Sequence, residues 1–235
     1  GLDYLLAAGI SPGMFTVVTA ANQYKLLDHF DFYVGKGIKK FNFSPILHSG
    51  KAADKKYDVN INHLIETNLK LMEKINLINN ECNNIEDYIS EVNISNLLNN
   101  LSSLNIYNLC TLAPCGAGHT MLGFDIDGSF YSCDYFIGNL EFKIGNIYEV
   151  DDIKNSIFRN PSVQNLLKRN IDSIKECRMC TWKNVCTYHC ASDSYFNHKT
   201  LYKPHSMCEY VKKIIPRIID LLYRKKISIN NIPPC

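Results

Sequence analysis

The strongest constraint in this sequence is a group of four cysteines within fourteen residues, in the segment CRMCTWKNVCTYHC. Two, five and three residues separate them, in the order Cys177, Cys180, Cys186 and Cys190. Four more flank the segment, and two others stand apart: the flanking ones are Cys110, Cys115, Cys133 and Cys208, and the outlying ones are Cys82 and Cys235. Eight thiols gathered in this way indicate shared use, in disulfides, in metal sites or in catalysis.

Composition narrows the setting of these thiols. The chain has 235 residues, 46% of them hydrophobic, which is enough for one large domain or two small ones. Its net charge of +2 comes from 25 basic and 23 acidic residues spread along the chain, so no nucleic-acid partner is expected. No apolar run approaches the about eighteen residues of a membrane span, and the first residues, GLDYLLAAGI, do not resemble a signal peptide. We therefore expect a cytoplasmic protein with no membrane partner.

In a reducing compartment, metal binding or catalysis explains ten cysteines better than disulfides do. A secreted disulfide framework remains an alternative, because small extracellular domains reach similar cysteine densities. A pair two residues apart, such as Cys177 and Cys180, can reach two corners of a 4Fe-4S cluster from one tight turn. Zinc also takes four thiolates, so this pair alone does not separate the two kinds of metal site.

The first part of the chain has the pattern of a strand, a helix and a second strand. Residues 14–20, MFTVVTA, predict a buried strand because they form a short β-branched run. Apolar residues then recur at helical spacing up to Val34, and Gly35 and Gly37 predict the end of that helix. Residues 38–46 predict a second strand. This βαβ order implies parallel pairing and a right-handed crossover.

Two predictions concern the middle of the chain. Apolar residues at helical spacing predict an amphipathic helix over 61–78. The asparagine-rich stretch that follows, up to residue 105, predicts short helices joined by loops, because asparagine favours caps and turns.

Beyond residue 110 the pattern changes to short strands and cysteines. Two apolar runs flank Asp127-Gly128, which predicts a β-hairpin, and Cys115 and Cys133 are expected to be fixed relative to it. A closing helix is predicted over 211–222, and Pro216 is expected to kink it or to end its first segment.

The whole cysteine pattern resembles the seven-cysteine signature of the SPASM domain of radical S-adenosylmethionine (radical SAM) enzymes. In that pattern twelve residues separate Cys115 from Gly128 and four separate Gly128 from Cys133, before the later cysteines. The resemblance implies two auxiliary 4Fe-4S clusters with Cys110 as an eighth ligand. It assigns the first cluster to Cys110, Cys115, Cys133 and Cys190, and the second to Cys177, Cys180, Cys186 and Cys208. Structural zinc remains the alternative, since it shares thiolate ligation.

The front of the chain is similar to the last strands of a radical SAM enzyme's partial barrel. The fold implied is α/β: C-terminal strands and helices of a partial (β/α) barrel with linking helices in residues 1–106, then a small cysteine-rich SPASM domain with a β-hairpin and helices in residues 107–235. Carboxyl ends of barrel strands face the reaction, so Asn22 and Ser44 are candidates for binding the cofactor or substrate. A cap at Asn22 and a strand stop at Pro45 are the structural alternatives.

The segment YSCDYFIGNLEFKIGNI resembles anaerobic sulfatase-maturating enzymes, in which the aspartate after the cysteine is the proposed general base. That aspartate corresponds to Asp134. A carboxylate beside an anionic cluster is expected to have a raised pKa, which suits proton abstraction. A hydrogen-bonded turn residue is the equally weighted alternative.

The radical-generating cluster of the family needs three cysteines spaced three and two apart, and these 235 residues contain no such triplet. We therefore expect the C-terminal part of a longer oxidoreductase that modifies a peptide or protein, in sulfatase maturation or ribosomal-peptide modification. Its parent would hold S-adenosylmethionine, a third 4Fe-4S cluster and an electron donor such as flavodoxin or ferredoxin. A truncated protein without radical chemistry, or a non-catalytic module that binds a partner peptide, is the alternative.

Overall fold

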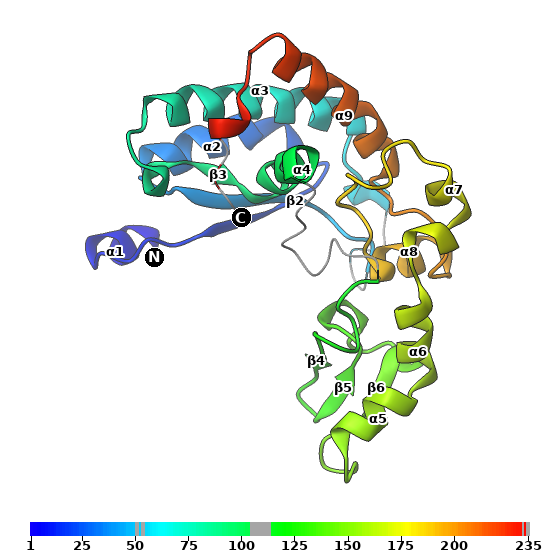
Figure 1. Cartoon of the computed structure of the whole chain (residues 1–235). Coiled ribbons are helices and arrows are strands. Elements are labelled where there is room, and N and C mark those ends of the chain that lie inside the picture. Colours follow the sequence, from blue (N-terminus) through cyan, green and yellow to red (C-terminus); the bar gives the residue numbers. More distant parts are fainter. Residues whose placement is uncertain (50–51, 53–54, 104–113, 232, 234–235) are drawn as a thin grey trace. The chain divides into compact units, whose positions relative to one another are not determined.

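The computed structural model describes residues 1–49, 52, 55–103, 114–231 and 233 (Figure 1). The chain forms two compact units, which are treated separately below. One unit comprises Gly1–Leu47, Lys51–Tyr107 and Glu209–Cys235, and the other comprises His48–Gly50 and Asn108–Cys208. The α/β class expected from the sequence is confirmed.

A parallel sheet of three strands is the framework of the first unit. Its strand order is β1 (Met14–Val18), β2 (Lys40–Pro45) and β3 (Ser90–Glu91). Between β1 and β2 runs α2 (Leu26–Gly35), so the predicted βαβ unit is confirmed. The helix ends where predicted, because Gly37 takes the positive φ of 74° that only glycine adopts freely.

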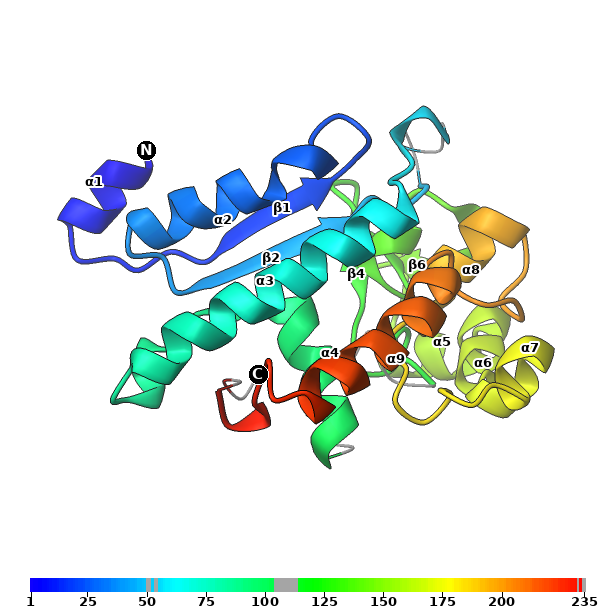
Figure 2. The same cartoon turned by 90° about the horizontal axis from the view of Figure 1, so that it is seen from above.

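Helices cover one face of this sheet. Figures 1 and 2 show α2 and α3 (Ile61–Glu81) on that face. The predicted helix over 61–78 is confirmed, and it starts where the Asn60 side chain accepts a hydrogen bond from the His63 N–H. A short helix, α1 (Leu2–Ala7), precedes β1 in the chain.

The asparagine-rich stretch contains separate helical segments as predicted, the first a 3-10 turn at Ile85–Asp87, together with a strand that was not predicted. A two-residue strand, β3, pairs with β2 and leads directly into α4 (Val92–Ser103), a helix of 12 residues. The sequence reading missed β3 because a Ser-Glu dipeptide has no apolar alternation. Its place in the sheet comes from pairing with Lys40 and Phe41, which lie far away in sequence.

Glu91 ties the sheet to α4 with a buried carboxylate. One carboxylate oxygen accepts from the Phe43 N–H at 2.8 Å, and the other accepts from the Ile94 N–H at 2.7 Å. Burial raises the pKa of Glu91 to about 7, while these backbone hydrogen bonds act in the opposite direction. The side chain therefore clamps β2 to the start of α4 at the expense of burying an ionisable group.

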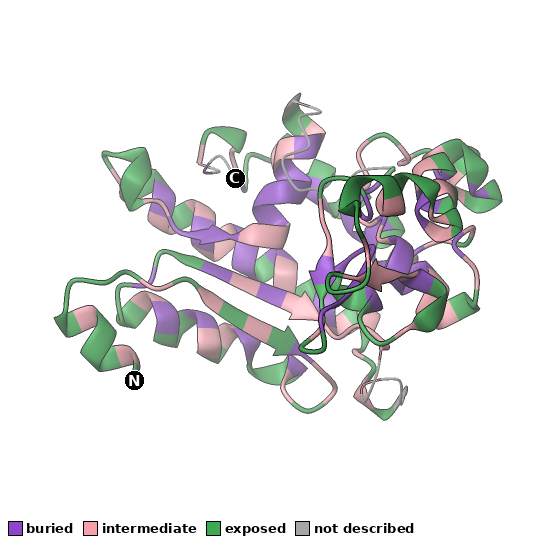
Figure 3. Cartoon of the chain, turned by 90° about the horizontal axis from the view of Figure 1, so that it is seen from below, coloured by how far each residue is buried: buried purple, intermediate pink, exposed green. Residues whose placement is uncertain are grey.

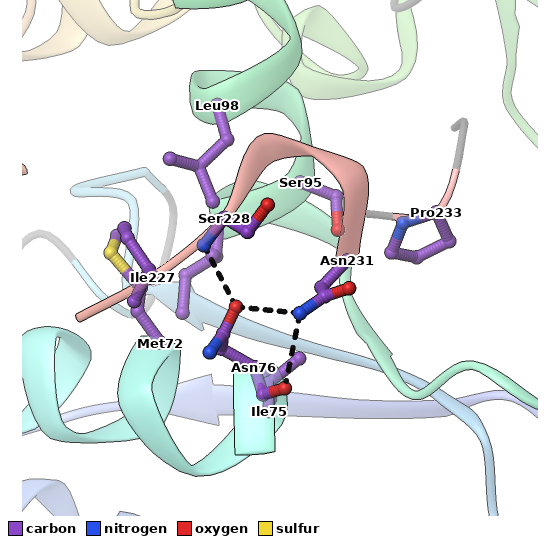
Figure 4. Close-up of a pocket in the computed structure, with 10 residues that line it drawn as sticks. Met72, Ile75, Asn76, Ser95, Leu98, Ile227, Ser228, Asn231 and Pro233 are labelled. Carbon is purple, nitrogen blue, oxygen red and sulfur yellow. Dashed lines mark hydrogen bonds between the residues drawn. The ribbon is translucent and has the colours of Figure 1, made fainter. Parts of the chain in front are cut away.

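The last segment of the chain packs with the first unit. Helix α9 (Cys208–Tyr223) runs through Pro216 as one element, so of the two expected outcomes, a kink or the end of a segment, the second does not occur. From this helix Arg217 pairs with Glu66 of α3. After it, Asn76 of α3 accepts from the Ser228 N–H at 2.8 Å and from the Asn231 side chain at 3.0 Å (Figure 4). The division at 106 and 107 stays a prediction for domains, but residues 209–235 fold against the first unit.

A three-stranded antiparallel sheet opens the second unit. Its strands are β4 (Gly123–Phe124), β5 (Ser129–Tyr131) and β6 (Lys143–Asn146). The predicted hairpin is confirmed: Asp125 and Ser129 close it, and Gly128 has a φ of 82°. The third strand, β6, was not predicted.

Short helices follow the sheet. They are α5 (Ile153–Arg159), α6 (Pro161–Lys168), α7 (Lys175–Arg178) and α8 (Ala191–His198). The core of the unit contains the stacked rings of Phe136 and Phe142, with centroids 3.7 Å apart. In the part of the chain that is described, no helix is both long and apolar enough to cross a membrane.

Replacing Glu91 by Gln is expected to change how the first unit responds to pH. The folded pKa of about 7 lies above the ordinary value of 4.5, so the contribution of Glu91 to stability is full below pH 4.5 and falls as pH rises through 7. The shift corresponds to roughly 3 kcal/mol. Hydrogen exchange of the β2 and α4 amides between pH 5 and 8 measures the effect, which E91Q should largely remove. The exposed control E81Q should keep the wild-type slope, and an unchanged slope in E91Q contradicts the prediction.

Candidate metal centre

Three of the four thiols assigned to the first cluster meet in one pocket of the second unit. The pocket is lined by Cys115, Cys133 and Cys190 together with apolar and small side chains, namely Ala117, Met121, Tyr135, Phe136, Ala191 and Ser192. These cysteines come from the loop before β4, the end of β5 and the start of α8. The fourth predicted ligand, Cys110, lies outside the described residues.

The hairpin holds Cys133 by close backbone contact. Gly123 of β4 lies against the main chain of Cys133, and a Cβ on this glycine would come 2.6 Å from the Cys133 carbonyl oxygen. The loop that carries Cys115 is tied to the same strand, because the Gly118 N–H donates to the Ser132 carbonyl at 2.6 Å. These backbone contacts explain physically why Cys115 and Cys133 are held in fixed positions relative to the hairpin, as expected from the sequence.

Burial controls the protonation of these thiols. Burial raises the pKa of Cys133 to about 12, and the neighbouring Cys190 thiol adds to the effect. Burial also raises the pKa of Cys190, while a contact between its Sγ and the Ser192 Oγ at 3.0 Å acts the other way. Metals bind the thiolate, so a metal that enters this pocket must displace protons.

The four thiols assigned to the second cluster also influence one another. Burial raises the pKa of Cys186 to about 12, and the thiols of Cys177, Cys208 and Cys180 raise it further. The pKa of Cys177 is raised by burial and then by Cys208 and Cys180. The Cys180 N–H donates to the Cys177 carbonyl at 2.9 Å, which closes the tight turn expected for this pair.

The described thiols of each set are sulfur donors of the kind that iron-sulfur clusters and structural zinc both use. Among the described residues, no three His, Cys, Asp or Glu side chains converge tightly enough to hold a single metal ion. The thiols of each set are related through a shared pocket or through mutual electrostatic effects. The assignment of individual ligands stays a prediction.

Asp134 is exposed and directly follows Cys133, at the start of a 3-10 helix over Asp134–Phe136. Its carbonyl accepts from the Ile137 N–H at 3.2 Å, so the backbone of this residue belongs to a turn. The carboxylate is therefore available to solvent beside the first thiol set. Its role as a base stays a prediction.

Asn22 and Ser44 lie at the carboxyl ends of β1 and β2 in the first unit. The Asn22 side chain accepts from the Thr19 N–H at 2.8 Å and donates to the Val17 carbonyl at 2.9 Å, so it shapes the loop after β1 and does not cap the following helix. Ser44 pairs in register with Val17.

The sheet presents Ser44 on the face opposite the helices. Along β2 the buried residues Phe41 and Phe43 alternate with Asn42 and Ser44, because successive side chains of a strand point to opposite faces. On β1 the same face carries Phe15 and Val17, which are 63% and 47% exposed. Figure 3 colours the whole chain by burial class. The β1 part of this face is therefore exposed, whereas on β2 the Asn93 side chain of α4 donates to the Asn42 Oδ1 at 2.8 Å.

One charged residue of the second unit was missed by sequence reasoning. Arg169 is only 1% exposed, although it follows Lys168 in what reads as a solvated basic helix end. The signal for its burial is absent from the local pattern, because its hydrogen-bond partners lie 20 to 32 residues further along the chain.

Comparison with known proteins bears on both units. Residues 115–181 match the SPASM family, described as an iron-sulfur cluster-binding domain. A protein of Archaeoglobus fulgidus is 31% identical over 115 residues, which are 49% of this chain and 27% of that protein. The resemblance to the SPASM domain predicted from cysteine spacing is confirmed.

Solved structures show the same fold. The anSMEcpe protein with bound AdoMet matches 98% of this chain with a TM-score of 0.73 at 16% identity, and the chain covers 57% of its length. A structure of native anSMEcpe with AdoMet and the Kp18Cys peptide has a TM-score of 0.71, also at 16% identity. The match covers 98% of this chain and 60% of the anSMEcpe chain. SuiB of Streptococcus suis has a TM-score of 0.58 at 16% identity, over 88% of this chain and 48% of that one. The chain thus spans about half to six tenths of these proteins.

Replacing Gly123 by Ala is expected to destabilise the second unit by about 2 kcal/mol, in the range for overpacking a close contact. The added methyl group would press on the backbone of Cys133, which is not a flexible side-chain end. Denaturant unfolding followed by the fluorescence of Trp182, the single tryptophan, reports on this unit. As a control, G35A adds its methyl group where no atom lies within 4 Å. Equal stability of G123A and wild type contradicts the prediction.

Proposed function

We propose that this chain, which carries an iron-sulfur cluster-binding SPASM domain on a radical SAM/SPASM fold, is the C-terminal portion of a maturase that oxidatively modifies a peptide or protein side chain. Sulfatase formylglycine formation and ribosomal-peptide modification are the two reactions of this class that suit it. The premise is the match of residues 115–181, and the fold of the whole chain supports it.

The observation that carries the proposal is the grouping of the thiols. Members of the first set share a pocket, and members of the second set act electrostatically on one another. For the described thiols this grouping agrees with the division that the SPASM resemblance implies, and it supports the proposal of two auxiliary 4Fe-4S clusters. Such clusters would supply an electron acceptor or an anchor for the substrate.

The residues of the chain would provide the setting for that chemistry. Apolar neighbours such as Met121 and Phe136 exclude water from the first pocket. Asp134, exposed beside Cys133, would take the proton from a substrate thiol or hydroxyl. A peptide substrate is supported by anSMEcpe structures that contain bound peptides.

The first unit would contribute part of the cofactor site. Asn22 and Ser44 lie at adjacent carboxyl ends of parallel strands, where barrel enzymes gather their chemistry. The similar anSMEcpe structures contain bound AdoMet. The third cluster, the upstream strands and an interaction with a flavodoxin or ferredoxin would belong to the longer parent protein, with a cytoplasmic location.

Metal analysis of the anaerobically purified chain tests the two clusters. We expect about eight iron atoms and about eight sulfides per chain, four of each per cluster. Cys133→Ser should lose about half of the iron, because Cys133 lies in the first pocket only. Cys82→Ser is the matched control, since Cys82 lies on the first unit outside both sets, and it should keep all of it. Zinc without sulfide in the wild-type chain would overturn the proposal.

Replacing Asp134 by Asn in the longer parent protein is expected to lower product formation about 100-fold or more, the usual effect of losing a general base. Cleavage of S-adenosylmethionine should continue, because that step precedes proton removal from the substrate. Mass spectrometry of peptide product and of 5′-deoxyadenosine measures the two separately. Asp151→Asn, an exposed aspartate of the same unit, serves as control. A parent protein that binds peptide but consumes no S-adenosylmethionine would identify a binding module instead of an enzyme.

A further inference from the structure

Ser192 places a buried hydroxyl group beside the first thiol set. The residue is 2% exposed, and it lines the same pocket as Cys115, Cys133 and Cys190. Its Oγ lies 3.0 Å from the Cys190 Sγ, which is a hydrogen-bond distance for an oxygen and a sulfur. The pocket that gathers these thiols therefore also holds a hydroxyl group in direct contact with one of them.

The backbone at the start of α8 fixes this contact. Cys190 directly precedes the helix, and Ser192 lies in its first turn. The Cys190 carbonyl accepts from the Ser194 N–H at 3.3 Å. The guanidinium of Arg169 donates to the His189 carbonyl at 2.7 Å and to the Ser194 Oγ at 3.1 Å. Because the chain is held on both sides of Cys190, the Ser192 hydroxyl stays within reach of the sulfur.

Metal binding decides which of the two atoms donates the hydrogen bond. While Cys190 is a thiol, either the Sγ or the Ser192 Oγ can be the donor. Metals bind the thiolate, which has lost its proton and can only accept. The Ser192 O–H is then the donor to a negatively charged acceptor, and such hydrogen bonds are stronger than those between neutral groups. Ligation of Cys190 would therefore both orient and strengthen this contact.

Two comparisons within the same unit show what distinguishes Ser192. The Cys186 Sγ of the second set lies 4.0 Å from the Tyr188 carbonyl oxygen, which accepts hydrogen bonds and cannot donate one to a thiolate. Ser132 is as buried as Ser192 and adjoins Cys133, but its Oγ has no hydrogen-bond partner among the described residues. It is also not one of the residues that line the pocket. Ser192, in contrast, offers a proton directly to a sulfur of the pocket.

We infer that the Ser192 hydroxyl donates a hydrogen bond to the Cys190 thiolate of the first cluster and raises the reduction potential of that cluster alone. This inference rests on the proposed function, since it concerns a cluster that the first thiol set would hold. It goes beyond that function, because it gives one of the two clusters a redox property that the other does not receive from this hydroxyl. Ser192 acts through a ligand of the cluster, so it is a positioning residue.

The physical argument concerns the charge of each redox state. A cluster that accepts an electron becomes more negative, and a hydrogen-bond donor at a ligand sulfur stabilises the more negative state more strongly. The apolar lining of the pocket strengthens this effect, because a hydrogen bond is electrostatically stronger where water is excluded. Removing the hydroxyl should therefore make the first cluster harder to reduce. The second cluster should keep its potential, because the sulfur that Ser192 contacts belongs to the first set.

A purely structural role for Ser192 predicts a different result. If the first turn of α8 needs only a small side chain at this position, alanine serves as well as serine, because it lacks only the hydroxyl and is a good helix former. Threonine keeps the hydroxyl and adds a methyl group. The pair S192A and S192T therefore separates the hydroxyl from the size of the side chain. S132A is the matched control, since it removes an equally buried hydroxyl next to Cys133.

The experiment uses the whole chain, purified anaerobically, with iron and sulfide analysis followed by an EPR-monitored titration with dithionite. The signal that remains in Cys133→Ser belongs to the second cluster, which assigns the two midpoint potentials. We expect S192A to lower the midpoint potential of the first cluster only, S192T to stay near wild type, and S132A to match wild type. An unchanged first cluster in S192A, an equal shift of both clusters, or the same shift in S132A would overturn the inference.

Loss of iron from S192A is also informative. If S192A loses the first cluster and S192T loads both, the site requires the hydroxyl and the inference is supported. If both variants lose the first cluster, the size of the serine side chain explains the site and the inference fails. A wild-type chain that binds no iron and sulfide would refute the proposed function and the inference with it. Wild-type clusters with an unmoved potential in S192A would refute the inference alone, so the two failures are distinguishable.

Discussion

The second unit depends on bringing cysteine sulfurs from separate segments into a common interior. The loop before β4, the end of β5 and the start of α8 contribute Cys115, Cys133 and Cys190 to one pocket. Cys115 and Cys133 also belong to the apolar core of the unit, together with Phe136 and Phe142. Packing and ligation are therefore coupled, because a metal bound there would hold the same segments that the core brings together.

Burying these sulfurs in one interior affects the ionisation of their thiols. Buried thiols resist ionisation, as the raised pKa values of Cys133 and Cys186 show. Coordination removes their protons and leaves negative charge in a region that water reaches poorly. In the same unit the buried side chain of Arg169 is held by the carbonyls of Leu201 and His189.

The first unit presents one face and one edge of a parallel sheet. Helices cover the face that carries Phe41 and Phe43, and the Glu91 carboxylate joins β2 to α4. The opposite face remains accessible at Phe15. Ser44 on β2 and Asn22 in the loop after β1 therefore lie near adjacent carboxyl ends, the edge where we propose that a ligand binds.

Local periodicity and spacing in the sequence were sufficient for the βαβ unit, for α3, for the Asp127-Gly128 hairpin and for the SPASM resemblance, because each depends on neighbours in the chain. Tertiary contacts alone decided the pairing of β3 and the packing of α9 against α3. They also decided the burial of Arg169, whose partners lie 20 to 32 residues away. Burial and charge environment are set by residues that meet only in the folded chain, so no local pattern records them.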